Sequence, residues 1–378
     1  MASILLVTND FGPRAGGIET FVIGLLERIP RGEVVVYTSS QENSESFDRK
    51  WSDQYGVEVI RDKSKILLPT PRVISNLKKV IRTRKLNKVW FGAAAPLAFS
   101  ARWLRKSGAE HIVALTHGHE VWWSKVWPFS WVMKEIARSI DVATYLGDFT
   151  RSAIAPRFSD PKKLIKIAPG IDTEHFKPRD TEELRRTLGL ADRPTIISVG
   201  RLVHRKGQDR LLEALPRIVE RFPNVTLIFV GEGPHRDHLD SLVKRFKLER
   251  NVLFIGRIQY AELPEYIALG DVFAMPSRSR LFGLEVEGLG IVYLEASACG
   301  IPVVGGASGG APDAVRHGET GYVVDGNDVG EISERIIQLL EDKYLRESMG
   351  SAGRQWAVEE WGWQRWSEAF NRALKINY

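Results

Sequence analysis

The sequence predicts an α/β protein with two doubly wound, Rossmann-like parallel-sheet domains that face each other across a cleft. Two patterns predict this fold. Short runs of β-branched residues alternate with longer helical patterns along the whole chain, and the alternation restarts after Pro169-Gly170. Strands of a parallel sheet are covered on both faces, so they read as continuous apolar runs. The length of 378 residues fits two domains at roughly 150 residues or more each.

The elements follow in two series, one for each predicted domain. The first domain is predicted over residues 1–170, with a helix over 17–28 and strands at 4–7, 34–37, 57–60, 88–91, 111–115 and 142–145. The second domain is predicted over residues 171–354, with strands at 195–199, 225–230, 252–255, 272–275, 301–304 and 321–324. In doubly wound domains, ligands bind at the carboxyl ends of the strands.

The last segment has a helical pattern and is rich in tryptophan. Residues 354–374 contain Trp356, Trp361, Trp363 and Trp366. A terminal helix with so many large aromatic side chains must bury them against another surface. We therefore expect a C-terminal helix over about 355–378 to pack back on the first domain.

The composition excludes a disordered or fibrous chain, because 43% of the residues are hydrophobic and 26% are charged. Lys and Arg outnumber Asp and Glu by 53 to 47, which gives a net charge of +6. Ten of the basic side chains lie between residues 61 and 90, where Asp62 is the one acid. Such a block favours a phosphate-bearing partner, which can be a nucleic acid, an anionic lipid or a phosphorylated substrate.

The cysteine content and the N-terminus indicate the compartment. Cys299, the one cysteine, cannot form an intramolecular disulfide, and its apolar sequence neighbours indicate a small core residue rather than a nucleophile. The N-terminus lacks the pattern of a signal peptide, and no run reaches the roughly 18 apolar residues that span a bilayer. We expect a cytosolic protein that contacts a membrane only at its surface.

Two glycine-containing turns precede predicted helices. Gly16 and Gly17 let backbone N–H groups approach an anion at a helix N-terminus. Their spacing fits neither a dinucleotide fingerprint nor a Walker loop, so a purely structural turn is the alternative. The second turn, residues 200–207, follows a predicted strand and carries Arg201 and Lys206. An arginine fork and a lysine point charge at a strand end are suited to binding a diphosphate.

A third motif combines two carboxylates with glycines. Gly288 and Gly290 can open a helix whose N-terminus points at an anion, while Glu295 inside the helix can accept hydrogen bonds from vicinal hydroxyls. Glu287 precedes the helix, and we interpret the two carboxylates as holding a sugar and a ribose. The alternative is a retaining glycosidase pair, which needs carboxylates roughly 5–5.5 Å apart. Eight residues of helix separate them by about 12 Å.

Two further motifs follow the strand predicted at 111–115. His117, His119 and Glu120 lack the spacing of a zinc helix, so a hydrogen-bonding role toward a substrate is favoured over a metal site. The aromatic run over residues 121–131 is either core or a surface that lies at a membrane interface.

These motifs resemble those of the retaining glycosyltransferases of group 1 (family 4), which have two Rossmann-like domains, the GT-B fold. The shared motifs cover nearly the whole chain and are Gly16-Gly17-Ile18-Glu19, Gly200-Arg201-Leu202 with Lys206-Gly207, and Glu287 with Glu295 ahead of Gly300-Ile301-Pro302-Val303-Val304. Within the family, the loop 278–290 is similar to that of mannosyltransferases that build phosphatidylinositol mannosides. The family's usual Glu-Gly-Phe-Gly is here Glu-Gly-Leu-Gly, with Leu289 in place of phenylalanine.

The resemblance implies the site residues. Arg201 and Lys206 bind the nucleotide diphosphate, Glu295 the ribose and Glu287 the transferred sugar, while His117 faces the sugar hydroxyls. The implied catalytic residues are thus Arg201, Lys206, Glu287 and His117. Those implied to bind the nucleotide sugar are Gly16, Gly17, Arg201, Lys206, Ile258, Glu287, Gly288, Leu289, Gly290, Ile291 and Glu295. Those expected to contact the acceptor or the membrane are Lys78, Lys79, Arg82, Trp122, Trp123 and Trp127.

The implied reaction is the retaining transfer of mannose from GDP-mannose to a phosphatidylinositol mannoside, with an α-1,6 linkage on the monomannoside. Fixed cations and a helix N-terminus can stabilise the departing diphosphate, so we expect no metal ion and no other cofactor. The expected partners are the nucleotide-sugar donor and an anionic phospholipid acceptor at the membrane surface, with no nucleic acid. We expect a cytoplasmic protein, peripheral on the inner face of the cell membrane. The alternatives are a transferase with another nucleotide sugar and a soluble acceptor, and a basic nucleic-acid-binding module.

Overall fold

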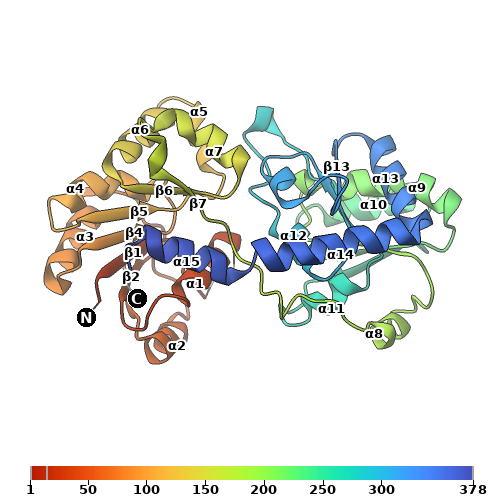
Figure 1. Ribbon diagram of the computed structural model, residues 1–378, viewed down its shortest axis with the longest axis horizontal. Helices are drawn as coiled ribbons and strands as arrows, with labels where there is room; N and C mark the ends of the chain where they lie inside the picture. The colour runs from red at the N-terminus through yellow and green to blue at the C-terminus, as the bar shows by residue number, and fades with distance from the viewer. Residues whose placement is uncertain (1, 14–15, 377–378) are drawn as a thin grey trace. The chain divides into compact units, whose positions relative to one another are not determined.

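The computed structural model describes residues 2–13 and 16–376, and it divides the chain into two compact units (Figure 1). The first unit comprises the residues up to Gly170 together with those from Trp363 onward, and the second runs from Ile171 to Gly362. Among the described residues, each unit contains one parallel sheet, of seven strands in the first and six in the second. The prediction of an α/β fold with two doubly wound parallel sheets is confirmed.

The sheet of the first unit has the strand order β3-β2-β1-β4-β5-β6-β7. Its strands are β1 (Ile4–Thr8), β2 (Val34–Thr38), β3 (Glu58–Arg61), β4 (Lys88–Phe91), β5 (His111–Ala114), β6 (Val142–Tyr145) and β7 (Leu164–Lys166). Its helices are α1 (Gly17–Leu26), α2 (Glu45–Tyr55), α3 (Pro71–Arg84), α4 (Ala101–Arg105), α5 (Glu120–Lys125), α6 (Phe129–Ser139), α7 (Asp148–Ile154) and α15 (Trp363–Ala373). The edge strand β7 was not predicted, because its three residues are half-buried and follow two lysines.

The central strands of this sheet are apolar on both faces, as a sheet covered by helices requires. Helix α3 packs Val73, Leu77 and Ile81 into the core of one face, together with side chains of α4 and α6. Thr70 caps the N-terminus of α3, because its hydroxyl accepts a hydrogen bond from the Val73 N–H. A proline occupies the first turn of the helix. The opposite side of this helix is left to solvent.

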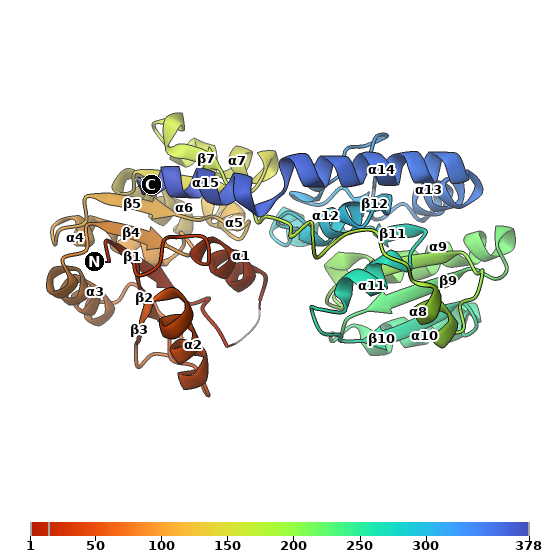
Figure 2. The same ribbon diagram turned by 60° about the horizontal axis from the view of Figure 1, so that its bottom comes forward.

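The C-terminal helix predicted over about 355–378 is in fact two helices, α14 (Lys343–Glu360) and α15. The helical run ends at Trp361, and the chain passes into the first unit after Gly362, so residues 355–362 belong to the second unit. Helix α15 belongs to the first unit and packs beside α1 (Figures 1 and 2). There Phe370 meets Trp90 with ring centroids 4.7 Å apart, and Arg28 lies over the Trp363 ring at 4.6 Å.

The sheet of the second unit has the order β10-β9-β8-β11-β12-β13. Its strands are β8 (Thr195–Val199), β9 (Thr226–Val230), β10 (Val252–Gly256), β11 (Val272–Met275), β12 (Val303–Gly306) and β13 (Gly321–Val324). Its helices are α8 (Glu182–Thr187), α9 (Gln208–Arg221), α10 (Arg236–Phe246), α11 (Leu263–Ala268), α12 (Ile291–Ala298), α13 (Val329–Glu341) and α14. Cys299 is buried after α12, as predicted, and burial raises the pKa of its thiol to about 12.

Each sheet has a point where the winding of the chain reverses. The chain starts on a central strand, builds outward to one edge and returns to the other side of that central strand, which makes β1 and β4 neighbours in the first unit and β8 and β11 neighbours in the second. Loops diverge at the carboxyl ends of such strand pairs and leave room for a ligand. Within the described part of the chain, no helix is long and apolar enough to cross a bilayer.

Candidate functional site

The second unit gathers charged side chains at its point of reversal. The turn after β8 contains a short 3-10 helix, His204–Lys206, and the loop after β11 runs to Gly290, where α12 begins. Because β8 and β11 are adjacent and parallel, both loops leave the same edge of the sheet. The sequence motifs at 200–207 and 287–295 therefore lie together, as the prediction of a shared site requires.

Glu287, in the loop after β11, contacts the turn after β8. Its carboxylate oxygen Oε2 lies 2.8 Å from Lys206 Nζ and 2.8 Å from Arg205 Nη1. Burial alone would raise the pKa of Glu287, but the Lys206 and Arg205 charges outweigh burial and hold the pKa below its usual range. The carboxylate is thus ionised at neutral pH, and two fixed cations converge on one oxygen.

Glycines allow the loops to approach so closely. Gly207 has φ +77°, and a Cβ there would lie 2.0 Å from the carbonyl oxygen of Pro276 in the loop after β11. Gly309 has φ +55°, and a Cβ there would lie 2.2 Å from the Glu287 carbonyl oxygen. Any other residue would push these loops apart. The convergence of Lys206 and Arg205 on Glu287 therefore depends on backbone packing as well as on charge.

Helix α12 brings the second predicted carboxylate to the site. Gly290, with φ +76°, precedes the first helical residue, and Gly288 and the buried Leu289 lead into it. The side chain of Glu295 is buried inside this helix, and burial raises its pKa to about 7, an effect that the charge of Lys206 only partly offsets. Lys206 thus acts on both glutamates. Ile291, at the first turn of α12, is half-buried.

We expect the Glu295→Gln variant to be more stable than the wild type at pH 8 and about equally stable at pH 5. The pKa rises from 4.5 to about 7 on folding, so between these pH values the folded chain keeps a proton that the unfolded chain has released. Stability therefore falls as the pH rises through this window, by on the order of 3 kcal/mol in total. Urea unfolding at pH 5, 6, 7 and 8 measures the difference, and parallel stability curves for the two proteins would contradict the assignment.

Two predicted donor-site residues lie around this cluster. Ile258 follows β10 and lines a cavity of about 390 Å³ with residues after β8 and β9, including Gly200. A Cβ on Gly200 would lie 3.9 Å from Lys206 Cε, so the cavity adjoins the cations. The side chain of Arg201 is exposed and pairs with no other side chain in the described ranges. Its role at the diphosphate stays a prediction.

The first unit positions His117 after β5. A carbonyl can only accept a hydrogen bond, so His117 Nε2, which lies 2.5 Å from the Gly92 oxygen, carries the proton and leaves Nδ1 as an acceptor. Desolvation lowers the pKa of His117, which favours this neutral form. Glu120 is fully buried and accepts the His117 backbone N–H at 2.9 Å, while His119 Nε2 lies 3.2 Å from its other oxygen.

A cavity of about 850 Å³ lies at the carboxyl ends of β1, β2 and β3. Gly16 lines it with polar residues that include Asp10, Glu19 and Lys65. Gly17, the first residue of α1, is exposed and is not among the lining residues. The turn before Gly16 lies partly outside the described residues.

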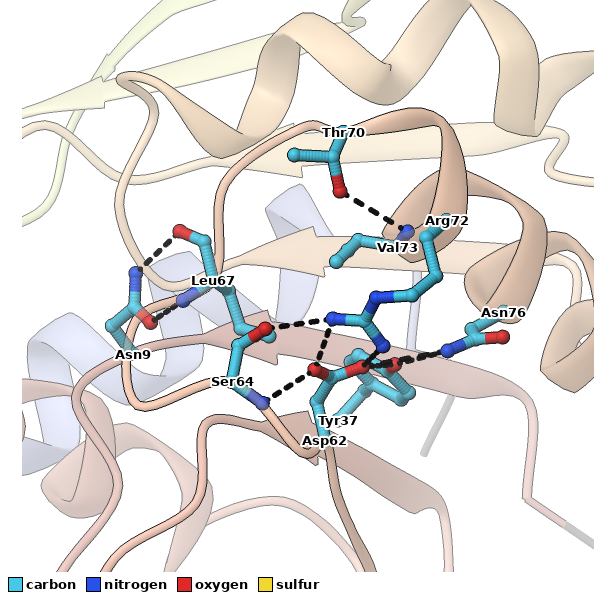
Figure 3. A network of polar contacts seen from close by, with 9 residues as sticks. All are labelled: Asn9, Tyr37, Asp62, Ser64, Leu67, Thr70, Arg72, Val73 and Asn76. Carbon is cyan, nitrogen blue, oxygen red and sulfur yellow. Dashed lines mark hydrogen bonds and ion pairs between the residues drawn. The ribbon is translucent and has the colours of Figure 1, made fainter.

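A polar network fixes the segment that forms one wall of this cavity (Figure 3). Asp62 accepts hydrogen bonds from the Arg72 guanidinium at 3.0 and 2.7 Å and from the Tyr37 hydroxyl. Asn9 Nδ2 donates a hydrogen bond to the Leu67 carbonyl oxygen at 3.1 Å, and Asn9 Oδ1 accepts one from the Leu67 N–H at 2.6 Å. Lys65 and Ile66, which line the cavity, are therefore carried on a segment anchored at both ends.

The basic block is only partly available to a partner. Of its ten side chains, Arg61 pairs with Asp48, Arg72 with Asp62 and Arg84 with Glu58, while Lys88 donates to the Lys375 carbonyl. The remaining six have no ion pair within the described ranges and are Lys63, Lys65, Lys78, Lys79, Arg82 and Lys85. The three predicted cations of α3 are among them.

The aromatic run divides into packed and exposed side chains. Trp122 and Trp123 pack edge-on against Phe129, with ring centroids 4.7 and 4.8 Å apart, and Trp123 also contacts the core. Trp127 is 80% exposed and Trp131 is 51% exposed. Of the three predicted interfacial tryptophans, only Trp127 presents most of its ring to solvent.

In residues 2–13 and 16–376, one group of side chains has the geometry to hold a metal ion, namely Asp209, His235 and His238. His117, His119 and Glu120 do not form such a group. Both oxygens of Asp209 accept hydrogen bonds from Arg278, at 2.8 and 2.6 Å, so a divalent ion would have to displace a buried guanidinium. The cluster is better suited to an ion pair than to a metal.

The sequence patterns did not single out Arg205, Asp209 or Arg278 as functional residues. Arg205 lies next to Lys206 in the 3-10 turn, and its position in a run of three basic residues is the signal that could have identified it. Asp209 and Arg278 are 69 residues apart in the chain, so their pairing leaves no local pattern.

Comparison with known proteins gives these motifs a context. Residues 15–175 match the family described as Glycosyltransferase Family 4, and residues 180–356 match the family described as Glycosyl transferases group 1.

Relatives align over nearly the full length. The chain is 44% identical to the GDP-mannose-dependent alpha-(1-6)-phosphatidylinositol monomannoside mannosyltransferase of Mycolicibacterium smegmatis, over 96% of this chain and 95% of that protein. It is 42% identical to the protein of the same name from Mycobacterium tuberculosis, with the same coverage. It is 40% identical to the GDP-mannose-dependent monoacylated alpha-(1-6)-phosphatidylinositol monomannoside mannosyltransferase of Corynebacterium glutamicum, over 98% of this chain and 97% of that protein.

Solved structures share the fold. HepE of Anabaena, in complex with UDP, superposes with a TM-score of 0.83 at 21% identity, over 100% of both chains. Sucrose-phosphate synthase from Thermosynechococcus elongatus superposes with a TM-score of 0.80 at 22% identity, over 99% of this chain and 98% of that chain. At such identities the likeness concerns the fold alone.

Proposed function

Because the chain belongs to the group 1 glycosyltransferases of family 4, we propose that it transfers mannose from GDP-mannose to phosphatidylinositol monomannoside, with an α-1,6 linkage and retention. The observation that carries the proposal is the convergence of Lys206 and Arg205 on Glu287 at the ends of β8 and β11. The two cations are suited to a diphosphate, and the carboxylate is suited to sugar hydroxyls.

The donor extends from this cluster. The diphosphate lies against Lys206 and Arg205, with Arg201 as a further cation that can swing in from solvent. Glu295 accepts hydrogen bonds from the ribose hydroxyls, and the base enters the cavity lined by Ile258, which adjoins the cations at Gly200. The N-terminus of α12 at Gly290 adds its partial positive charge.

Breaking the bond between mannose C1 and the diphosphate oxygen leaves negative charge on the diphosphate. Fixed cations and a helix N-terminus stabilise that charge without having to reorganise, so we propose a reaction that needs no divalent ion. The acceptor hydroxyl attacks from the face that the diphosphate leaves, which gives retention and places its proton beside a phosphate oxygen that can accept it. His117 Nδ1 is free to accept a hydrogen bond from a sugar hydroxyl.

We infer that the 850 Å³ cavity of the first unit receives the headgroup of the acceptor. Its wall combines hydroxyl and carboxylate side chains, which suit the hydroxyls of an inositol or a mannose, with Lys65, which suits a phosphate.

A transfer assay tests the proposal. GDP-[¹⁴C]mannose with EDTA and phosphatidylinositol monomannoside in liposomes is run beside UDP-[¹⁴C]glucose and beside a lipid-free reaction. Labelled lipid formed only with GDP-mannose and acceptor, and in the presence of EDTA, is the expected result. Labelled water-soluble product with no labelled lipid would favour a soluble acceptor, and activity restored only by added metal would overturn the metal-free mechanism.

We further propose that the protein works as a peripheral protein on the cytoplasmic face of the cell membrane, held by α3 and Trp127. Lys78, Lys79 and Arg82 lie on α3 and have no ion pair in the described ranges. A basic side chain near an anionic membrane contributes about 1 kcal/mol, so three of them strengthen binding by roughly a hundredfold.

Replacing Lys78, Lys79 and Arg82 together by glutamine is therefore expected to weaken binding to phosphatidylserine-containing liposomes by roughly a hundredfold at 0.1 M salt. Liposome flotation measures the partition. The matched control replaces Lys244, Lys247 and Arg250 of the second unit by glutamine, which removes the same charge from exposed side chains. Equal losses in the two triple variants would show that net charge, rather than α3, governs binding.

A further inference from the structure

We propose that Arg278 is a positioning residue for the transfer reaction, because its buried guanidinium fixes the turn that carries Arg205 and Lys206. The inference rests on the proposed function, since it concerns the same donor site. Arg278 follows β11 and is not one of the residues that converge on Glu287. Its guanidinium contacts residues on both sides of the turn after β8, so we expect its effect to pass through that turn.

The Arg278 guanidinium is in contact with both Asp209 and His204. Nη1 and Nη2 donate to the two carboxylate oxygens of Asp209, at 2.8 and 2.6 Å, and Nη2 also lies 2.8 Å from His204 Nδ1. The side chains of Arg278 and Asp209 are only 4% and 8% exposed. Burial alone would raise the pKa of Asp209, but Arg278 holds the pKa below its usual range, so the pair is ionic. A planar fork with two parallel hydrogen bonds leaves little freedom of orientation.

Arg278 contacts a residue on each side of the two cations and the backbone of Arg205 itself. His204 is the first residue of the 3-10 turn, and Asp209 lies in the first turn of α9. The backbone N–H of Arg278 donates to the Arg205 carbonyl at 2.8 Å. Arg205 and Lys206 are thus fixed by contacts on the residue before them, on their own backbone and on the helix after them, all from one residue of the neighbouring loop.

Such fixing matters because two like charges must share one oxygen. Arg205 Nη1 and Lys206 Nζ each lie 2.8 Å from Glu287 Oε2, and their mutual repulsion favours any movement that separates them. The Arg205 side chain is 30% exposed and is long enough to swing into solvent. Without Arg278 the turn is free to relax, and a diphosphate then meets one well-placed cation instead of two.

A buried ion pair that only stabilises the fold makes a different prediction. It would act on the whole unit, and its loss would add to the loss caused by any other substitution. A residue that acts through Arg205 has little left to lose once the Arg205 side chain is gone. Non-additivity therefore separates positioning from general stability.

The test is a double-mutant cycle with Arg278→Met and Arg205→Ala, in which the Kd for GDP is measured by calorimetry and kcat by mannosyl transfer. Arg278→Met alone is expected to raise the Kd about tenfold and to lower kcat about thirtyfold, while in the Arg205→Ala background each change is about twofold or less. Arg278→Lys keeps the charge but not the fork, and is expected to recover part of both losses. Full additivity, or unchanged values in Arg278→Met, would overturn the proposal.

Two comparisons keep the test decisive. Arg210→Met breaks the Arg210–Glu213 ion pair on α9 but keeps the Arg210 backbone and the Arg278–Asp209 pair, so it is the control for loss of an ion pair on that helix. Where Arg278→Met does not fold, as judged by thermal unfolding, Asp209→Asn takes its place in the cycle with the same expected coupling. If no donor or acceptor supports transfer in the wild type, the proposed function fails, but the binding cycle with GDP and UDP still decides the role of Arg278.

Discussion

The Lys206→Ala variant is expected to lose at least about a hundredfold in kcat for mannosyl transfer, because the departing diphosphate loses its most buried fixed cation. Lys206 Nζ is the buried member of the pair on Glu287, with only 12% of its side chain exposed against 30% for Arg205. A buried charge acts in a region of low dielectric, where its effect on a developing charge is largest. Single-turnover assays at saturating GDP-mannose isolate kcat from donor binding.

The control for Lys206→Ala is Lys244→Ala, which removes an exposed lysine of α10 that has no ion pair in the described ranges. The Arg201→Ala variant, compared in the same assay, tests whether the exposed arginine also acts on the departing diphosphate. Near-full turnover in Lys206→Ala would remove this lysine from the mechanism and would leave Arg205 and Arg201 as the cations to examine.

The second large effect is expected from Glu287→Gln, in which binding and turnover move apart. In the free protein the carboxylate partly neutralises Lys206 and Arg205, so its removal leaves a site that is more positive toward a diphosphate. We expect the Kd for GDP to stay within about threefold of the wild type or to fall, while kcat falls by roughly a hundredfold because the sugar loses its carboxylate.

Calorimetry with GDP and the transfer assay measure these two quantities for Glu287→Gln. Glu285→Gln is the matched control, because Glu285 lies 3.9 Å from Arg205 Nε and pairs with Arg280, but it does not reach Lys206. If transfer by Glu287→Gln matched that of Glu285→Gln, the role of Glu287 toward the sugar would be wrong, and its carboxylate would serve only to balance the cations.

The fold could be predicted from the sequence where local pattern and tertiary structure agree. β1, β2 and β8 are buried at every position and consist mostly of aliphatic residues, and this pattern is sufficient to identify a strand covered on both faces. The break between α14 and α15 could not be predicted, because tryptophans and helix-forming residues continue on both sides of Gly362. The helix ends there because the chain passes from one unit to the other. The position of that boundary depends on the tertiary structure and not on the local sequence.

The clustering of candidate site residues could be predicted to the extent that these residues stand beside glycines at strand ends. Lys206, Glu287 and Glu295 were singled out in this way, and in the structure Lys206 pairs with Glu287 and its charge acts on Glu295. Arg205 was not singled out although it lies beside Lys206 in a basic run, and Arg278 was missed because its partner Asp209 lies 69 residues away in the chain. No local period or spacing encodes such pairs. They arise only where two parallel strands end side by side.

The assignment of α15 to the first unit has a consequence for biosynthesis. Phe370 covers Trp90, the Ala373 carbonyl lies 2.7 Å from His111 Nε2, and Trp363 packs near Phe21. These covering groups leave the ribosome after the whole of the second unit, which is one uninterrupted stretch of sequence. The second unit can therefore fold to completion while the first, although made earlier, still exposes Trp90 and Phe21. Nascent chains stalled before Trp363 should thus hold a native second unit and an incomplete first one, the reverse of the usual order in which domains mature.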